Sequence, residues 1–249
     1  MKNQIILWLS SIIIVFLIGY IKNITDKDYP ITSTFGIEGK KVSYKLDKVC
    51  YDKESYKNII ISDIQGIRAR LFWRNNNQQY ETDYKNIEDG LECNIPIQNP
   101  GQEIKYKLVI QHKGKTFEIL KKEFIPLMFW GHIPSPVNIL HFILLYGALL
   151  MSLRSLLELF NKNKNLKKFI VIVCTMFMTL TILIHPLYNS YKLGAINNYI
   201  PNVIELLEPL FLVITFLWVF GAVLIFNKKY VNIVTIFISS ATILLFFFL

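Results

Sequence analysis

Five apolar runs constrain this chain more than any other feature. They cover residues 5–21, 137–153, 169–187, 206–226 and 231–249. Each is long enough for a bilayer-spanning helix, which takes roughly 20 residues and tolerates about 17. The polar segment between the first two runs is long enough for a small folded domain. The sequence therefore predicts an N-terminal anchor (1–22), a folded domain (23–128) and a four-helix transmembrane domain (129–249).

The net charge of +9 is unevenly distributed. Residues 22–136 hold 18 Lys and Arg against 15 Asp and Glu, and most of the remaining excess lies at Lys2 and in the connections 154–168 and 227–230. This is the positive-inside pattern of a membrane protein rather than a nucleic-acid surface. We expect the cytoplasmic (inner) membrane, with the N-terminus and both basic connections cytoplasmic. Residues 23–136 and the C-terminus are then extracytoplasmic.

The first apolar run has a second interpretation, a cleaved signal peptide. Lys2 supplies the charged start that such a peptide needs. The run is long, however, and the following stretch GYIKNITDK lacks a small-x-small cleavage site. We therefore expect an uncleaved anchor.

The polar segment carries the two-residue period of half-buried strands. Residues 67–74, IRARLFWR, alternate apolar and mainly basic side chains, and residues 78–84 and 104–110 also alternate. The HKGK stretch (112–115) followed by TFEIL predicts a hairpin. Short strands separated by Asn, Gly and Pro predict an antiparallel β-sandwich across residues 36–125.

The order RARLFWR…YETDY…LECNIPIQNPGQEIKYKLVI resembles immunoglobulin and fibronectin type III-like modules of bacterial surface proteins. In those modules a strand ends in Ile-Pro, a Pro-Gly turn follows, and the next strand carries an aromatic residue, matched here by Pro100, Gly101 and Tyr106. The resemblance implies an all-β immunoglobulin-like sandwich. It implies no particular function, because such sandwiches serve many.

The whole chain resembles a group of uncharacterised bacterial inner-membrane proteins. The shared positions are Gly131, Pro134, His141, Pro186, Tyr191 and Gly194. The group carries a Trp- and Gly-rich outer loop, which is similar to loops of haem-handling proteins in cytochrome c maturation. This chain has AINNYIPNVIELLEP there, without tryptophan. That departure weakens any haem interpretation.

Three histidines are expected near the outer membrane face. His132 precedes the second helix, His141 lies about one turn inside it, and His185 ends the third. Imidazoles bind haem and metals, and ionisable residues in membranes are often functional, so His141 and His185 form the candidate cofactor-binding pair. The competing interpretation is that both are interfacial side chains. Because the sequence has no Cys-x-x-Cys-His and no paired metal motif, we predict no cofactor and no metal.

Two charged pairs are further candidates. Glu205 and Glu208 share a helix face before Pro209. One interpretation is a proton or cation site formed with His185 or Lys192, and the other is a pair of exposed acids at the helix start. Arg154 and Glu158 form an i, i+4 pair at the cytoplasmic end of the second helix, which topology control explains without a ligand.

Other polar residues carry weaker expectations. Cys50 and Cys93 share a compartment where disulfides persist, so a bridge between them stays open. The three arginines of the 67–74 stretch, Arg68, Arg70 and Arg74, are expected on a solvated sheet face, with an anionic partner as the alternative. The small residues Ala148, Ser152 and Ser155 are candidates for a close helix–helix contact.

No Walker loop, Gly-x-Ser-x-Gly elbow or His-Glu-x-x-His helix is present, and no catalytic residue is assigned. The favoured hypothesis is a non-catalytic integral membrane protein whose extracytoplasmic sandwich binds other membrane or extracytoplasmic proteins or supports a membrane complex. The alternative is a membrane subunit handling haem, a metal or an ion through His141, His185, Glu205 and Glu208. A transporter is disfavoured, because no inverted repeat or broken helix pair is visible.

Overall fold

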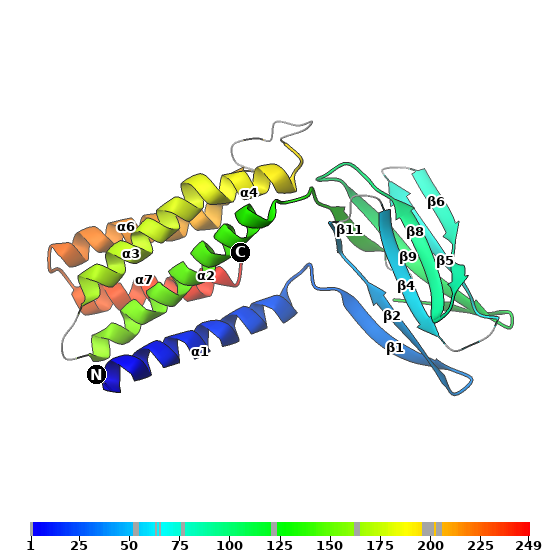
Figure 1. Cartoon of the computed structure of the whole chain (residues 1–249), viewed down its shortest axis with the longest axis horizontal. Coiled ribbons are helices and arrows are strands. Elements are labelled where there is room, and N and C mark those ends of the chain that lie inside the picture. The colour runs from blue at the N-terminus through cyan, green and yellow to red at the C-terminus, as the bar shows by residue number, and fades with distance from the viewer. Residues whose placement is uncertain are drawn as a thin grey trace. The chain divides into compact units, whose positions relative to one another are not determined.

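The structure is a computed structural model that describes residues 2–51, 55–62, 64, 66–75, 78–120, 124–161, 165–195, 202 and 206–249. The chain forms two compact units (Figure 1). The helical unit comprises Met1–Thr25, Ile133–Tyr191 and Ala195–Leu249, and the β unit comprises Asp26–His132 with Lys192–Gly194. No sequence pattern assigns the short segment Lys192–Gly194 to the β unit.

The β unit contains two sheets. The first has the order β1 (Ile31–Ile37), β2 (Lys40–Leu46), β4 (Ser55–Ser62), β8 (Gly90–Pro96) and β7 (Lys85–Ile87). The second has the order β3 (Val49–Cys50), β11 (Ile125–Phe129), β9 (Glu103–His112), β5 (Arg68–Asn75) and β6 (Gln78–Asp83), and β10 (Lys115–Glu118) also pairs with β9. In the described part of the chain, β11 and β3 pair in parallel and the other pairs are antiparallel.

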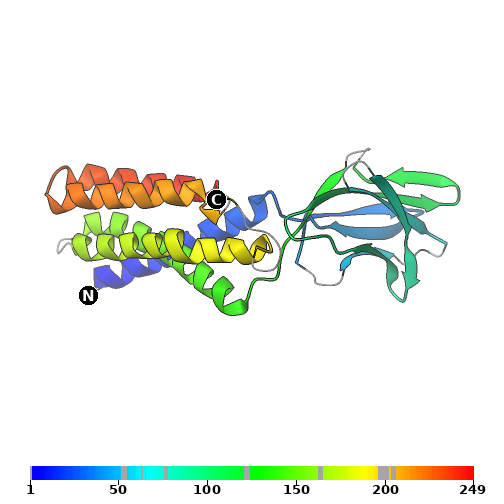
Figure 2. The ribbon, with the colours of Figure 1, turned by 90° about the horizontal axis from the view of Figure 1, so that it is seen from above.

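The predicted alternation along β5 is confirmed. Ala69, Leu71 and Trp73 are buried, and the residues between them point to the other face. They join one hydrophobic core to which both sheets contribute, for example Ile60 and Ile95 from the first sheet and Leu108 and Leu127 from the second. Figure 2 shows the strands of the β unit turned by 90° from the view of Figure 1. Burial of alternate residues on two facing sheets explains why this segment folds as a sandwich.

The predicted hairpin after residue 112 is also confirmed. His112 pairs with Lys115, so the loop contains only Lys113 and Gly114. Both have positive φ values, 47° and 78°, as a type I′ turn requires. Gly114 accepts this conformation at little cost because it has no Cβ.

The helical unit consists of α1 (Lys2–Thr25), α2 (Ser135–Leu157), α3 (Leu166–Thr179), α4 (His185–Lys192), α6 (Pro209–Phe226) and α7 (Val231–Phe246). A short 3-10 turn, η1 (Glu158–Phe160), follows α2, and a π-helical segment, η2 (Leu180–Ile184), joins α3 to α4. Within the described residues, four stretches are long and apolar enough to cross a membrane, namely Gln4–Thr25, Ser135–Phe160, Leu166–Lys192 and Pro209–Phe226.

The fifth expected span is shorter than the sequence predicted. α7 has 16 residues and ends at Phe246, whereas the apolar run continues to residue 249. At 1.5 Å per residue such a helix reaches about 24 Å, less than the roughly 30 Å of a bilayer core. The fourth span also begins at Pro209 rather than residue 206. Proline favours the first helical position, because its missing N–H needs no partner there.

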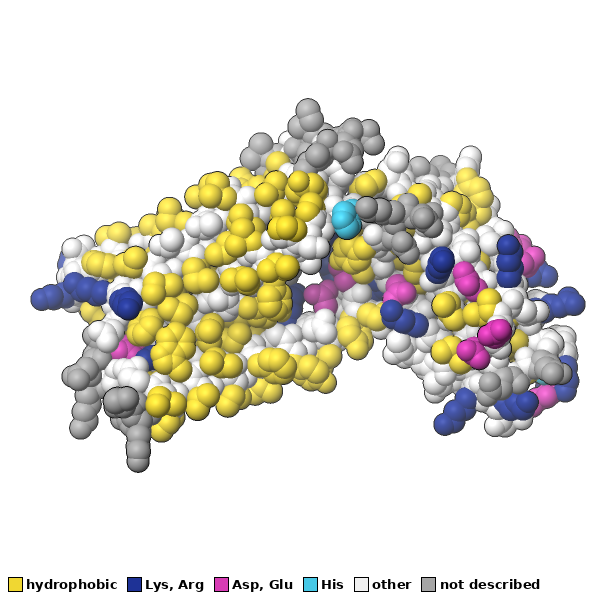
Figure 3. Space-filling model, viewed as in Figure 1, with side chains coloured by type: hydrophobic (Ala, Val, Ile, Leu, Met, Phe, Trp, Pro, Cys, Tyr) yellow, Lys and Arg dark blue, Asp and Glu magenta, His cyan; other side chains and the backbone are white. Residues whose placement is uncertain are grey.

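The surface of the helical unit matches a lipid environment. On the face shown in Figure 3, hydrophobic side chains cover the helices along their length, and Lys and Arg side chains gather at one end. The exposed residues of α1 include Ile5, Leu9, Ile13 and Phe16. The N-terminus and the α2–α3 and α6–α7 connections lie at the same end of this unit (Figure 1).

The helices also pack through small and polar residues. Ala148, Ser152 and Ser155 are fully buried on α2, as predicted for a close contact. The hydroxyl of Ser239 on α7 donates to the carbonyl of Ser152 at 3.2 Å. Trp218 of α6 donates from its ring nitrogen to Thr242 of α7 at 2.8 Å. Small side chains allow such close backbone approach between membrane helices.

Candidate functional site

The structure brings together the two histidines predicted to act as a pair. Nε2 of His141, on α2, lies 3.0 Å from Nδ1 of His185, at the start of α4. The ring of Tyr188 stacks on His141 at a centroid distance of 4.3 Å, and Phe211 meets His185 edge-on at 4.6 Å. His185 is only 8% exposed. The pair therefore lies in an aromatic environment inside the helical unit.

The position of His185 depends on the π-helical segment η2 immediately before it. A π segment adds one residue to a helical turn, so the residues that follow are rotated relative to a regular α-helix. Pro186 follows His185 and cannot donate a backbone hydrogen bond to the turn before it, which favours such an irregularity. The His-Pro pair inside an apolar run is therefore the sequence feature that could have indicated this irregular helix.

Asn189 orients the pair. Its Nδ2 atom lies 2.9 Å from Nε2 of His185 and 3.3 Å from the carbonyl oxygen of Leu206. A carbonyl oxygen only accepts, so Asn189 presents its NH₂ group and also donates to Nε2 of His185. A neutral His185 then carries its proton on Nδ1 and donates to Nε2 of His141. This gives a directed hydrogen-bond chain, Asn189 to His185 to His141.

This arrangement limits how the pair holds a metal or haem. Both imidazole Nε2 lone pairs already accept hydrogen bonds, so a metal bound by both rings would replace the proton between them. Among the described residues, no three His, Cys, Asp or Glu side chains come together as a metal site. The described groups at the pair that could bind a metal are its two imidazoles, the phenol of Tyr188 and the amide of Asn189.

Two other predicted members of this site, His132 and Glu208, have surroundings of their own. His132 belongs to the β unit and is exposed. Glu208 is the half-buried N-cap residue of α6, where its carbonyl accepts from the N–H of Phe211 at 3.1 Å. Glu205 lies outside the described residues. Leu206 connects the start of α6 to the pair, through its bond from Asn189.

Arg154 and Glu158 form an ion pair that is fully buried, which the sequence did not predict. Nη1 of Arg154 lies 2.6 Å from Oε2 of Glu158, and both side chains are 0% exposed. Glu158 also accepts from the backbone N–H of Asn165 at 2.8 Å and from the side chain of Asn161 at 3.0 Å. These bonds tie the end of α2 to the connection that precedes α3.

Arg154 also holds the N-terminal helix. Its guanidinium donates to the side chain of Gln4 on α1. It lies over the rings of Phe169 and Trp8, with centroid distances of 4.7 and 5.4 Å. Cation–π contacts of this kind strengthen when water is excluded. One arginine of α2 thus contacts both α1 and α3.

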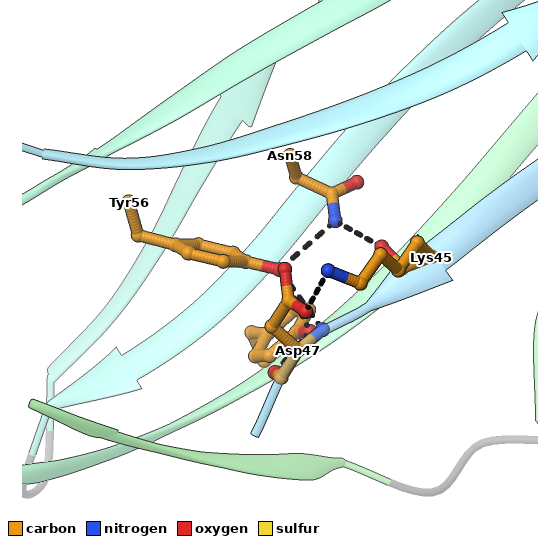
Figure 4. A network of polar contacts seen from close by, with 5 residues as sticks. Lys45, Asp47, Tyr56 and Asn58 are labelled. Atoms are coloured by element: carbon orange, nitrogen blue, oxygen red, sulfur yellow. Dashed lines mark hydrogen bonds and ion pairs between the residues drawn. The ribbon is translucent and has the colours of Figure 1, made fainter. Parts of the chain in front are cut away.

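A buried tyrosine network lies inside the β unit, and sequence reasoning missed most of it (Figure 4). Tyr106 donates to the carbonyl of Asp47 at 2.7 Å and lies 3.2 Å from the hydroxyl of Tyr56. Tyr56 accepts from the N–H of Asp47 at 3.1 Å and from Asn58 at 3.0 Å. Burial raises the pKa values of Tyr56 and Tyr106, so both stay neutral. The network joins β4 to β9 and is structural, since its hydroxyls are satisfied.

The disulfide left open by the sequence is not formed. Cys50 is on β3 and Cys93 on β8, in different sheets, and Cys93 is a reduced thiol whose sulfur faces the carbonyl of Thr82 at 4.0 Å. Burial raises the pKa of Cys93 to about 12. Both cysteines are core residues that pack as small apolar side chains.

The three arginines of β5 share the outer face of the second sheet, and they differ in their surroundings. Arg70 pairs with Glu81 at 2.8 Å and with Asp83 at 3.5 Å on β6. Neither Arg68 nor Arg74 has a carboxylate within 4.0 Å in the described part of the chain. Arg70 is therefore neutralised within the sheet, and Arg74 is not.

Comparison with known proteins adds no assignment to these observations. No protein-family model, curated protein or solved structure matches the chain. The histidine pair, the buried ion pair and the surface of the second sheet are thus interpreted from geometry and chemistry.

Proposed function

We propose that the protein is a non-catalytic integral membrane protein that presents its β unit outside the cytoplasm, to bind a partner protein or to support a membrane complex. One observation carries the proposal: the β unit has a complete core of its own. Its interior hydroxyls of Tyr56 and Tyr106 join the two sheets, and Asn58 donates to Tyr56. An exposed surface, rather than a catalytic interior, is then what this unit offers.

The proposed fold of the β unit is the immunoglobulin or fibronectin type III-like sandwich. Two facing sheets of mainly antiparallel strands around one core support it. We further propose that the chain belongs to the bacterial inner-membrane group that it resembles in sequence. His141 is one of the residues that carry this resemblance. It lies in a hydrogen-bonded pair, which supports a role shared with that group.

The proposed orientation places the N-terminus in the cytoplasm and the β unit outside. Support comes from the basic residues Lys167, Lys168, Lys228 and Lys229, which lie in or beside the two connections at the N-terminal end of the helical unit. The helices α1 and α2 meet the β unit in sequence at their other ends, Thr25 and Ser135.

Cysteine labelling in intact cells tests this orientation. The variant Thr34→Cys is expected to react with a membrane-impermeant maleimide, because Thr34 is exposed on β1. The variant Lys229→Cys is expected to react only after the cells are permeabilised. The unaltered chain, whose cysteines are Cys50, Cys93 and Cys174, is the labelling control. The reverse pattern would overturn the orientation.

Site-specific photo-crosslinking tests the binding role. A photoreactive residue placed at exposed positions on each sheet, such as Thr34 and Gln79, is expected to capture a defined partner protein from at least one of them. Absence of any specific adduct from both faces would count against a binding role for the β unit.

The histidine pair favours a second candidate function, the handling of a redox cofactor or an ion by the helical unit. The 3.0 Å contact between His141 and His185 is the observation behind it. The protein purified in mild detergent would then show a Soret band or a stoichiometric metal. Both signals would be lost in His141→Ala and in His185→Ala. A colourless, metal-free protein would remove the cofactor version of this candidate.

A further inference from the structure

A cluster of positive and aromatic side chains covers part of the second sheet's outer face. It consists of Phe72 and Arg74 on β5, Lys105 and Lys107 on β9, and Phe124 immediately before β11. Arg74 and Lys105 are exposed, and Lys107 and the two phenylalanines are half-buried. We refer to these five residues as the cationic–aromatic patch.

The strand register places like charges opposite one another in this patch. Arg74 on β5 is directly opposite Lys105 on β9, and Phe72 is opposite Lys107. A like-charged pair in directly opposed positions destabilises a sheet. A face kept only for solubility gains nothing from such a pair.

No carboxylate relieves this repulsion in the described part of the chain. Arg74, Lys105 and Lys107 have no Asp or Glu oxygen within 4.0 Å, whereas the neighbouring Arg70 has two carboxylates. Elsewhere on the β unit, Lys45 and Lys113 each form an ion pair at 2.8 Å. Among the described residues, the cations of the patch thus form no ion pair of their own.

Phe124 orients the cations of the patch. The guanidinium carbon of Arg74 lies 4.2 Å from the centre of the Phe124 ring, and Nζ of Lys107 lies 5.7 Å from the centres of both Phe124 and Phe72. Nε of Arg74 donates to Gln79 at 3.3 Å. A guanidinium held against a ring and by one bond keeps its other N–H groups available. Those groups match the two oxygens of a carboxylate.

We propose that this patch is the partner-binding surface of the β unit, and that its partner is a protein presenting an extended acidic segment. The inference rests on the proposed binding function and adds the chemistry of the partner. Charge complementarity selects an anionic partner. Lys105 and Lys107 are two positions apart, so their spacing of about 6.6 to 6.8 Å matches acidic residues at alternate positions of an extended segment.

Peptide binding to the full-length protein tests the chemistry. The protein is placed in nanodiscs of zwitterionic lipid and titrated with a fluorescent peptide of alternating Glu and Thr. The matched control peptide has Gln in place of Glu. We expect saturable binding of the Glu peptide only, weakening steeply as the salt concentration rises.

Variants locate the binding on the patch. Arg74→Gln combined with Lys107→Gln is expected to weaken binding of the Glu peptide at least tenfold. Lys57→Gln, on the outer face of the other sheet, is expected to leave it unchanged. The charge-reversal variant, Arg74→Glu with Lys107→Glu, is expected to bind a Lys-Thr peptide instead. That gain of binding also shows that the altered sheet is folded.

Three outcomes would overturn the proposal. They are no binding of the Glu peptide, equal binding by the double Gln variant, and binding of the protein to anionic vesicles but not to the peptide.

The crosslinking experiment separates this inference from the proposed function. Partner capture from position 34 but not from position 79, which is opposite Arg74, would refute the patch and keep the binding role. Capture from neither position would refute both.

Discussion

Nε2 of His141 and Nδ1 of His185 lie 3.0 Å apart, although 44 residues separate them in the chain. The bond joins α2 to the start of α4, and Asn189 continues it to the carbonyl of Leu206 before α6. Three segments of the helical unit therefore meet at one hydrogen-bonded chain. The contact serves packing whether or not the pair also handles an ion.

The direction of this chain predicts the tautomer of His185. With Asn189 donating to Nε2, neutral His185 carries its proton on Nδ1, which nitrogen-15 NMR of labelled histidine detects directly. The variant Asn189→Leu is expected to lose this preference, and His132→Ala, at an exposed position, leaves it unchanged. A proton found on Nε2 in the unaltered protein would contradict the assigned direction.

Removal of Arg154 is expected to be strongly destabilising. Arg154→Ala leaves Glu158 buried without its partner, and breaking such a pair costs about 3–5 kcal/mol. The double variant Arg154→Met with Glu158→Gln removes both charges and is expected to recover much of the loss. Thermal unfolding in detergent measures both. Equal melting temperatures for Arg154→Ala and the unaltered protein would show that the pair contributes nothing.

The variant Tyr106→Phe is expected to loosen the β unit. It removes the donor to the Asp47 carbonyl and a partner of Tyr56, and an unsatisfied buried group costs about 1–3 kcal/mol. Hydrogen–deuterium exchange of the full-length protein should then increase along β4 and β9. Tyr80→Phe, at an exposed position of β6, is the matched control and should leave exchange unchanged.

Acid is expected to loosen the contact between the β1–β2 turn and the β9–β10 turn. Hydrogen bonds from Lys113 and then His112 lower the pKa of Glu38 below its ordinary value of 4.5. A lowered folded pKa stabilises the protein above the unfolded value, and this stability is lost as the pH falls from 4.5 through the lower folded value. Amide exchange at residues 37–40 and 112–115 should rise in that window. Glu38→Gln should abolish the pH dependence of this exchange.

We expect the buried thiols of the β unit to be unreactive toward alkylating reagents. Because burial raises the pKa of Cys93 to about 12, it stays protonated and resists iodoacetamide at pH 8 until the β unit unfolds. The intact mass of the protein should not change on reduction, since Cys50 and Cys93 are not bridged. A gain of two hydrogens on reduction would show that a disulfide forms.

Local patterns determined much of the architecture. The apolar runs predicted five membrane-spanning helices, and four described stretches are long and apolar enough for this, because length and hydropathy decide whether a helix crosses a bilayer. Alternation in residues 67–74 predicted β5 and its buried face, and the HKGK stretch predicted the β9–β10 hairpin. These features depend on neighbours within a few residues, so they are visible without a fold. α7 is the exception, since its helix stops at Phe246 while the apolar run continues.

Only the tertiary structure decided which polar residues meet. Arg154 donates a hydrogen bond to Gln4, which is 150 residues distant in the sequence. Tyr106 donates to the carbonyl of Asp47, at a separation of 59 residues. The π-helical segment before His185 turns that ring in a way that regular helical periodicity does not specify. The charge on Arg74 was visible in the sequence, but the register that sets it against Lys105 was not. Such contacts depend on strand register and helix rotation, which packing of the whole core determines.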